Sequence, residues 1–201
     1  MTSKYVAESL GWFLRKVAID YVRYGYVRYA LCTIPEVKAG EEELRRIDRK
    51  LISTYRVTYH GTTRARRRAK GLANVAYVRY RRWFVLLSSE GMHDSDEFER
   101  LSPKDIREVP FVFCGYIVSL KRGKVQVAMT GRRMGRIEKI AKQIALHQEG
   151  KVRAFFLNIS HSIHFPGVVR QKLKLLRSIN QKRKRAGLSR LSWTIPRPNI
   201  I

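Results

Sequence analysis

Five large apolar residues in a row, Trp83 to Leu87, constrain the fold of this 201-residue chain more than any other stretch. A continuous apolar run with polar residues on both sides is typical of a strand that is buried on both faces, near the middle of a sheet. We therefore predict one central strand over about 74–88, and we expect the side chains of residues 84–87 to be almost inaccessible to solvent.

A dense basic run comes shortly before this strand. Its cations are Arg64, Arg66, Arg67, Arg68 and Lys70. A threonine at position 62 or 63 is a suitable N-cap for a short helix that ends at Lys70, and Gly71 is a suitable stop. Because the run and the strand are adjacent in the sequence, we expect the buried strand to fix the position of a cationic surface.

The charge of the whole chain is strongly unbalanced. Forty-two Lys and Arg against sixteen Asp and Glu give a formal net charge of +26. Hydrophobic residues make up 44% of the chain, and ten are tyrosines, which argues against a disordered basic tail. Self-repulsion opposes the folding of such a chain, and a polyanionic partner would relieve it. We therefore expect a nucleic-acid partner, with RNA slightly favoured over DNA.

Several other classes have little support in the sequence. No uninterrupted apolar run approaches the length of a membrane span, and Arg15, Lys16 and Asp20 interrupt the apolar residues of the N-terminus, which therefore does not resemble a signal peptide. Cys32 and Cys114 lie in strand-like segments and are interpreted as buried free thiols in a reducing compartment, which predicts a cytoplasmic protein. No C-x-x-C pair supports a zinc site, and no cofactor or metal is predicted.

The remaining pattern predicts an α+β fold. Helices are expected over 3–24, 41–55, 62–70, 102–108, 134–148 and 166–186, and strands over 26–34, 74–88, 111–120, 125–130 and 152–159. This order is compatible with a mainly antiparallel sheet that has helices packed on one face, in a ferredoxin-like or split β-α-β arrangement. We predict one nucleic-acid-binding domain over 1–187 and an extended tail over 188–201.

A short recurrence provides the first candidate binding surface. The tetrapeptide YVRY occurs three times, the last at 77–80. In an extended segment, Tyr77, Arg79 and Arg81 share one face, and Arg82 points to the other. Arginine beside tyrosine offers a stacking plane and a phosphate partner, which suits single-stranded or looped nucleic acid. The alternative is that tyrosine and valine are simply good strand formers, and that arginine tolerates sheet edges.

The predicted helix over 166–186 provides the second candidate. Val169, Leu173, Leu176 and Asn180 form a stripe that is expected to pack on the body of the protein. The cations expected on the outside are Arg170, Lys174, Arg177, Lys182, Arg183, Lys184 and Arg185. Favourable interaction with the helix dipole is worth under about 1 kcal/mol and involves one or two charges, so four consecutive cations exceed it. Phosphate contact is therefore preferred over a merely solvated face.

The third candidate is the segment Gly131–Arg136, which joins a predicted strand to a predicted helix. Its cations are Arg132, Arg133 and Arg136. Glycines beside cations at a helix N-terminus can hold phosphate through backbone N–H groups. The segment lacks the Lys-Ser/Thr pair of a P-loop, so nucleotide hydrolysis is not predicted. Phosphate contact and a plain connection fit the segment equally well.

Catalysis has to be considered from the five histidines. A metal-binding pair on one face of a strand needs histidines separated by one residue, whereas His161 and His164 are separated by two. His93 and Asp94 suit a divalent ion, although a solvated acidic loop is the preferred interpretation of this segment. His60 or Tyr59, beside the basic run, fits metal-free RNA cleavage loosely. None of these sets has a convincing ligand spacing, so no catalytic residue is assigned.

Three classes of function therefore remain open. A non-catalytic nucleic-acid-binding subunit of a ribonucleoprotein or mobile-element complex is preferred. A nuclease or a replication-initiator-like nicking enzyme is the first alternative, and a ribosome-associated structural protein or a membrane-surface binder is the second. The glycine-aromatic strand signature of RNA-recognition modules is absent, since Arg81–Leu87 has apolar bulk where exposed rings are required.

Overall fold

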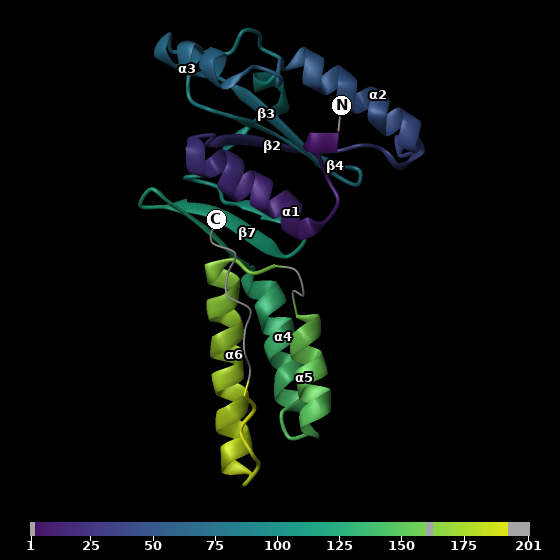
Figure 1. The fold of residues 1–201 in the computed structure, drawn as a ribbon, viewed down its shortest axis with the longest axis vertical. Helices are drawn as coiled ribbons and strands as arrows, with labels where there is room; N and C mark the ends of the chain where they lie inside the picture. Colours follow the sequence, from purple (N-terminus) through teal and green to yellow (C-terminus); the bar gives the residue numbers. More distant parts are fainter. Residues whose placement is uncertain (1–2, 160–162, 193–201) are drawn as a thin grey trace. The chain divides into compact units, whose positions relative to one another are not determined.

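Two β-sheets and six α-helices make up the described part of the chain, which is α+β as predicted (Figure 1). The computed structural model describes residues 3–159 and 163–192. The chain divides into two compact units: unit 1 comprises residues 1–111 and 119–125, and unit 2 comprises 112–118 and 126–201. The single domain over 1–187 stays a prediction.

Unit 1 is built on a five-stranded sheet. Its strands are β1 (Val6–Ala7), β2 (Arg28–Thr33), β3 (Val75–Tyr80), β4 (Trp83–Ser88) and β5 (Lys104–Asp105), in the order β1-β3-β4-β2-β5. β1 pairs in parallel with β3, and the other neighbours are antiparallel. β4 lies at the centre, so the predicted burial is confirmed for Val85, Leu86 and Leu87, whereas Phe84 is only half-buried.

The prediction of one strand over 74–88 is wrong. The segment is a hairpin of β3 and β4, with Val78 opposite Val85 and Tyr80 opposite Trp83. Arg81 lies in the turn with φ 55°, in the left-handed region. Such turns are normally signalled by Gly, Asn or Asp, so an arginine at this position gave no turn signal.

The N-terminal segment is not the continuous helix predicted over 3–24. A 3-10 turn (Ser3–Tyr5) and β1 come first, and then follow α1 (Leu10–Arg15), a π-helical turn (Lys16–Tyr21) and a second 3-10 turn (Val22–Tyr24). Ser9 is the N-cap of α1, because its side chain accepts a hydrogen bond from the N–H of Trp12 at 3.2 Å. Phe13, Leu14 and Val17 of this segment are in the core.

The next two helices agree with the predictions. They are α2 (Glu41–Thr54) and α3 (Gly61–Ala69), and α2 contributes Leu51 and Ile52 to a core cluster with Tyr77, Leu86 and Phe98. The helix predicted over 102–108 is wrong, because Ser102 has φ 50° and β5 follows it. A serine in this left-handed conformation ends the preceding 3-10 turn (Glu99–Leu101) and does not cap a new helix.

A second sheet contains β6 (Phe111–Phe113), β7 (Tyr116–Lys121) and β8 (Lys124–Met129) in that order. The predicted strand over 111–120 is thus two strands, separated by Cys114 and Gly115, which have φ values of 45° and 78°. The hairpin predicted at 121–124 is confirmed, with Arg122 and Gly123 at φ 50° and 72°. Two successive positive φ values are typical of the tight turn that joins antiparallel strands.

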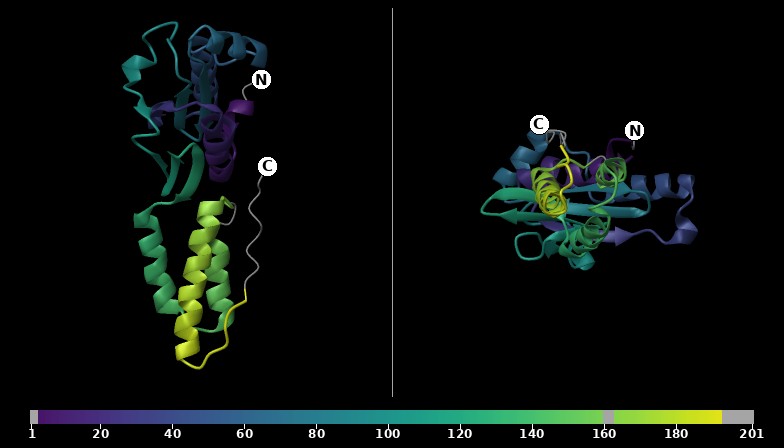
Figure 2. Two further views of the ribbon diagram at one scale, coloured as in Figure 1. Left: turned by 90° about the vertical axis from the view of Figure 1, so that its left-hand side faces the viewer. Right: turned by 90° about the horizontal axis from the view of Figure 1, so that it is seen from below.

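Three helices follow in unit 2: α4 (Gly131–Ile144), α5 (Glu149–Asn158) and α6 (Pro166–Arg185), with α4 in contact with both others (Figure 2). The helices predicted over 134–148 and 166–186 are confirmed. The strand predicted over 152–159 is wrong, since this segment belongs to α5. A short apolar run is ambiguous between a strand and a buried helix, and here Val152 and Phe156 are buried four residues apart.

Two further predictions concern the cysteines and the membrane. Both cysteines are free thiols, but Cys32 is only half-buried and Cys114 is exposed, so their predicted burial is wrong. None of the helices within 3–159 and 163–192 is long and apolar enough to cross a membrane. The compartment stays a prediction.

Candidate functional site

α6 is organised by a buried stripe along one side. Its inward residues are Val168, Lys172, Leu175, Leu176, Ile179 and Arg183. The spacing of three or four residues keeps them on one face of the helix. Except at Leu176, this stripe differs from the predicted one, which used Val169, Leu173 and Asn180. Burial lowers the pKa of the Lys172 ammonium group.

The opposite side of α6 is cationic and exposed. Its residues are Arg170, Lys174, Arg177, Lys184 and Arg185, which we call the α6 basic face. Successive residues of an α-helix are about 100° apart, which places these five side chains within a sector of about 100°. All five were predicted on the outside from the sequence. The helix contains no Asp or Glu, so no acidic neighbour within α6 balances them.

The other two cations at the end of α6 have structural contacts. Lys182 Nζ donates to the carbonyl of Lys142 at 2.8 Å. Arg183 is only 3% exposed and donates to the carbonyls of Ala145, His147 and Ser189 at 3.0, 2.9 and 2.8 Å. The carbonyls of Lys142 and Ala145 belong to the C-terminal end of α4, where the last carbonyl groups of a helix have no partner within their own helix, whereas His147 follows α4 and Ser189 follows α6. The predicted surface role of Arg183 is therefore wrong.

A groove between α4 and α6 extends the cationic surface. Its volume is about 560 Å³, and the cations that line it are Lys142, Lys174, Lys182 and Arg185. Glu138 is the one acidic residue among the residues that line the groove. Because Lys174 and Arg185 belong to both, the groove is continuous with the α6 basic face. Lys142 was not selected from the sequence, where nothing distinguishes it from other solvated lysines.

The charge imbalance of the chain is concentrated in unit 2. Residues 126–201 contain seventeen Lys and Arg but only two acidic residues, Glu138 and Glu149, whereas residues 1–125 contain twenty-five Lys and Arg and fourteen acidic residues. Glu149 is already paired with Arg153 at 2.7 Å. In unit 1, by contrast, acidic residues are available to pair with surface cations, as Glu43 does with Arg46 at 3.2 Å on α2.

The N-terminus of α4 carries the third predicted cluster. Arg132 and Arg136 are exposed, and the three arginines line a groove of about 600 Å³ together with apolar side chains of α4 and α5. Arg133 lies over the ring of Tyr116, 4.5 Å from its centroid, and donates to the carbonyl of Cys114 at 3.2 Å. Thr130 accepts a hydrogen bond from the Arg133 N–H at 3.3 Å. Arg133 is thus held by the fold, and the other two arginines face solvent.

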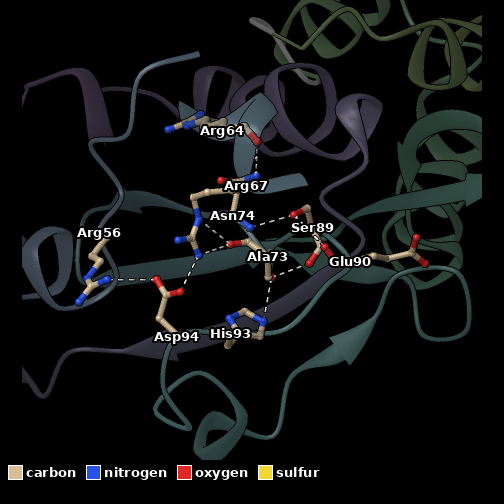
Figure 3. Close-up of polar contacts among 10 residues, drawn as sticks. Arg56, Arg64, Arg67, Ala73, Asn74, Ser89, Glu90, His93 and Asp94 are labelled. Atoms are coloured by element: carbon tan, nitrogen blue, oxygen red, sulfur yellow. Dashed lines mark hydrogen bonds and ion pairs between the residues drawn. The ribbon is translucent and has the colours of Figure 1, made fainter. Parts of the chain in front are cut away.

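The basic run on α3 divides in the same way. Arg64 donates to the carbonyl of Val57 at 2.8 Å. Arg67 donates to the carbonyl of Ala73 at 2.9 Å and to Asp94 at 3.0 Å (Figure 3). The three remaining cations of the run are exposed: Arg66, Arg68 and Lys70. Two of the five cations predicted to contact nucleic acid, Arg64 and Arg67, therefore form hydrogen bonds within the protein itself.

The predicted stacking face on 77–82 is not a surface. Asp48 is fully buried and accepts two hydrogen bonds from Arg79, at 2.7 and 2.9 Å, and one from the Tyr77 hydroxyl at 2.5 Å. Burial, followed by the hydrogen bond to Asp48, raises the pKa of Tyr77. Tyr77 and Arg79 therefore belong to the core, where they present no face to a ligand. Arg81 stays exposed, and Arg82 lies 3.4 Å from Glu36.

Asp48 is a structural residue of α2 that was not selected from the sequence. Its position carried a signal, since it lies between Ile47 and Leu51, on the side of α2 that packs on the sheet. A carboxylate on an apolar stripe predicts a buried cation partner, because an unpaired buried charge is very costly.

Two of the candidate catalytic sets meet in one pocket of unit 1. The pocket has a volume of about 300 Å³, and Tyr59, His93 and Asp94 line it together with Arg56 and Arg67. Asp94 is held between the guanidinium groups of Arg56 at 3.3 Å and Arg67 at 3.0 Å (Figure 3). Arg67 also lies over the Tyr59 ring, 5.0 Å from its centroid. The acid and the cations of this pocket thus neutralise one another.

His93 has a structural environment. Its ring stacks on Phe98 with centroids 4.6 Å apart, and its Nε2 atom lies 3.0 Å from Ser88 Oγ and 3.8 Å from a Glu99 oxygen. Burial lowers the pKa of His93. In a Ser-His-acid triad the acid contacts the other ring nitrogen, whereas here both groups approach Nε2, and Ser88 is fully buried. The geometry therefore does not activate Ser88 as a nucleophile.

The other histidines add no metal site to the described residues. His60 precedes α3 and is exposed, and His164 lies shortly before α6. His161 lies outside the described residues, so the structure does not describe how it lies relative to His164. Within 3–159 and 163–192, no three His, Cys, Asp or Glu side chains gather where they could hold a metal ion.

Comparisons with protein-family models and with curated proteins give no relative. No protein-family model matches the chain, and no curated protein matches it. Among the cationic surfaces of this protein, the α6 basic face and the adjoining groove have the most exposed cations, with Glu138 as the one acidic residue that lines the groove.

Proposed function

We propose that this protein binds nucleic acid through its phosphates, with the α6 basic face as the main contact, as a subunit of a nucleoprotein complex. One observation carries the proposal: five exposed cations line one side of a twenty-residue helix that contains no acidic residue. The opposite side is buried, so the direction in which the cations project is fixed by packing. Surface charge that serves only solubility does not require this separation.

The energetics of the helix support an anionic partner. Like charges at a spacing of four residues, as in Arg170 and Lys174, destabilise a helix by about 0.2–0.5 kcal/mol a pair. The α6 basic face extends over about 22.5 Å, from Arg170 to Arg185, at about 1.5 Å a residue. A row of phosphates along this length would replace repulsion by charge-assisted hydrogen bonds, which are the strongest hydrogen bonds in proteins.

The salt dependence of binding tests the proposal. We expect replacement of Lys174, Arg177 and Lys184 by Gln to flatten the slope of log affinity against log salt by about 2.7 for duplex DNA or about 2.1 for a single strand, since each phosphate contact contributes about 0.9 or 0.7. The slope is measured by fluorescence anisotropy with labelled oligonucleotides between low and physiological salt. Circular dichroism of the variant verifies that its helix content is unchanged.

A matched control removes the same charge from unit 1. Lys38, Arg49 and Lys50 are exposed cations in and near α2, where acidic residues are close, and all three are replaced by Gln. We expect this variant to keep a slope near that of the wild type. An unchanged slope in the α6 variant, or an equal loss in both variants, would contradict the assignment to α6.

A further inference from the structure

We infer that the nucleic acid bound by the α6 basic face is double-stranded DNA, and that α6 lies in its major groove. This inference rests on the proposed function and names the substrate class of the same surface. The carrying observation is the exposed side of α6, a row of long cations with one amide, Gln181, on a helix without a single aromatic residue.

The surface chemistry disfavours a single strand. Proteins that bind single-stranded nucleic acid combine cations with aromatic side chains on which the bases stack. Pro166–Arg185 contains no Phe, Tyr or Trp, and Lys142, its cationic neighbour across the groove, adds none. The tyrosine that had suggested stacking, Tyr77, is buried in unit 1. The surface offers contacts to phosphates and polar edges, which a duplex presents.

The dimensions favour B-form DNA over an RNA duplex. A helix of twenty residues is about 30 Å long and, with its side chains, about 10–12 Å across. The major groove of B-DNA is about 12 Å wide and admits an α-helix. The major groove of A-form RNA is deep and narrow, so an RNA duplex would meet α6 only across its shallow groove. A straight helix that is cationic along its exposed side therefore has its best fit in DNA.

The polar groups are arranged as a groove-bound helix requires. Gln181 projects from the centre of the exposed side, one turn from Arg177 and close to Lys184. Amide and guanidinium groups are the side chains that contact adenine and guanine edges in pairs of hydrogen bonds. Towards α4, the groove lined by Lys142, Lys174 and Lys182 is a cationic channel in which the phosphates of one strand would lie. The centre of the face would then contact bases, and its α4 side would contact the backbone.

A comparison of three ligands tests the inference. The probes share one sequence of about 20 nucleotides and are prepared as duplex DNA, duplex RNA and single-stranded DNA. As duplex DNA, this length is about twice that of α6. At a single salt concentration we expect duplex DNA to bind at least about tenfold more tightly than the other two, a difference of about 1.4 kcal/mol. Methyl green, which occupies the major groove, should displace the protein, and netropsin, which occupies the minor groove, should not.

The same variants separate the inference from the proposed function. The α6 variant (Lys174, Arg177 and Lys184 to Gln) should lose the preference for duplex DNA, and the α2 control should keep it. Equal affinity for all three ligands, or displacement by netropsin alone, would overturn the inference and leave phosphate binding by α6 intact. Failure to bind any of the three would overturn both.

Discussion

Replacement of Asp48 by Ala is expected to destabilise unit 1 more than any change on its surface. The Asp48 carboxylate is 0% exposed, and Arg79, which is 6% exposed, donates to both of its oxygens. Tyr77 donates to the same carboxylate at 2.5 Å. The variant would leave the Tyr77 phenol and the Arg79 guanidinium group in the core without the carboxylate, although Arg79 keeps its hydrogen bond to the carbonyl of Arg81 at 2.6 Å.

The expected loss follows from these contacts. Removing one partner of a buried ion pair costs about 3–5 kcal/mol, and a further hydrogen bond, here that of Tyr77, is worth about 1 kcal/mol. Since single domains are stable by about 5–15 kcal/mol, the variant would have lost a large part of its stability. Asp48→Asn, which keeps an acceptor oxygen but loses the charge, is expected to lose less.

Urea unfolding measures this loss, with tryptophan fluorescence as the signal, because Trp83 begins β4. Glu41→Ala is the control on the same helix: Glu41 pairs with Arg45 at side-chain exposures of 80% and 63%, and an exposed pair is worth about 0.2–1 kcal/mol. Replacing Asp48 and Arg79 together by Leu is expected to recover much of the loss, since apolar substitutes for a buried pair are often neutral. A loss below about 1 kcal/mol for Asp48→Ala would refute the account.

Three further predictions concern stability. Arg183→Met should cost about 2–4 kcal/mol of stability, since three carbonyl groups lose a charged donor. Lys184→Met, which changes an exposed neighbour, should change stability by under about 0.5 kcal/mol. Equal shifts of the melting temperature in the two variants would contradict the capping role of Arg183. The pKa of His93 is lowered in the folded protein, so protonation favours the unfolded state, and stability should fall as the pH falls below about 6.5. His93→Phe should weaken this pH dependence. If the urea midpoint of the variant had the same pH profile as that of the wild type, His93 would be excluded as its source. Leu86→Ala should cost about 2–5 kcal/mol in the same assay, and a cost near zero would contradict its central position in the sheet.

The long periodic segments of this protein were predictable from sequence. α2, α3 and α6 begin and end within a residue or two of their predicted limits, because each has several turns of consistent apolar spacing or a clear stop. The hairpin at Gly123 was predictable because glycine favours positive φ. The turns at Arg81 and Cys114 were not, since neither residue type indicates a left-handed backbone, and both were placed inside longer strands.

The candidate binding surface was predictable only in part. Arg170, Lys174 and Arg177 were expected on the outside of a basic helix, and they are exposed. The groove towards α4 was not foreseen, because it depends on which helix packs beside α6. The shift of the buried stripe also turned Arg183 inward, against the end of α4.

The charge of +26, its concentration after residue 126 and the absence of acidic residues from 166–185 follow directly from the order of the amino acids. Which cations are free to bind a partner depends instead on how the chain folds. Arg79 and Arg183 carry the same charge as Arg177, but their donors meet a carboxylate or carbonyl groups from distant segments, whereas Arg177 faces solvent. A guanidinium group is available to phosphate only where the fold supplies no acceptor of its own, and acceptors that are remote in sequence come together only through folding.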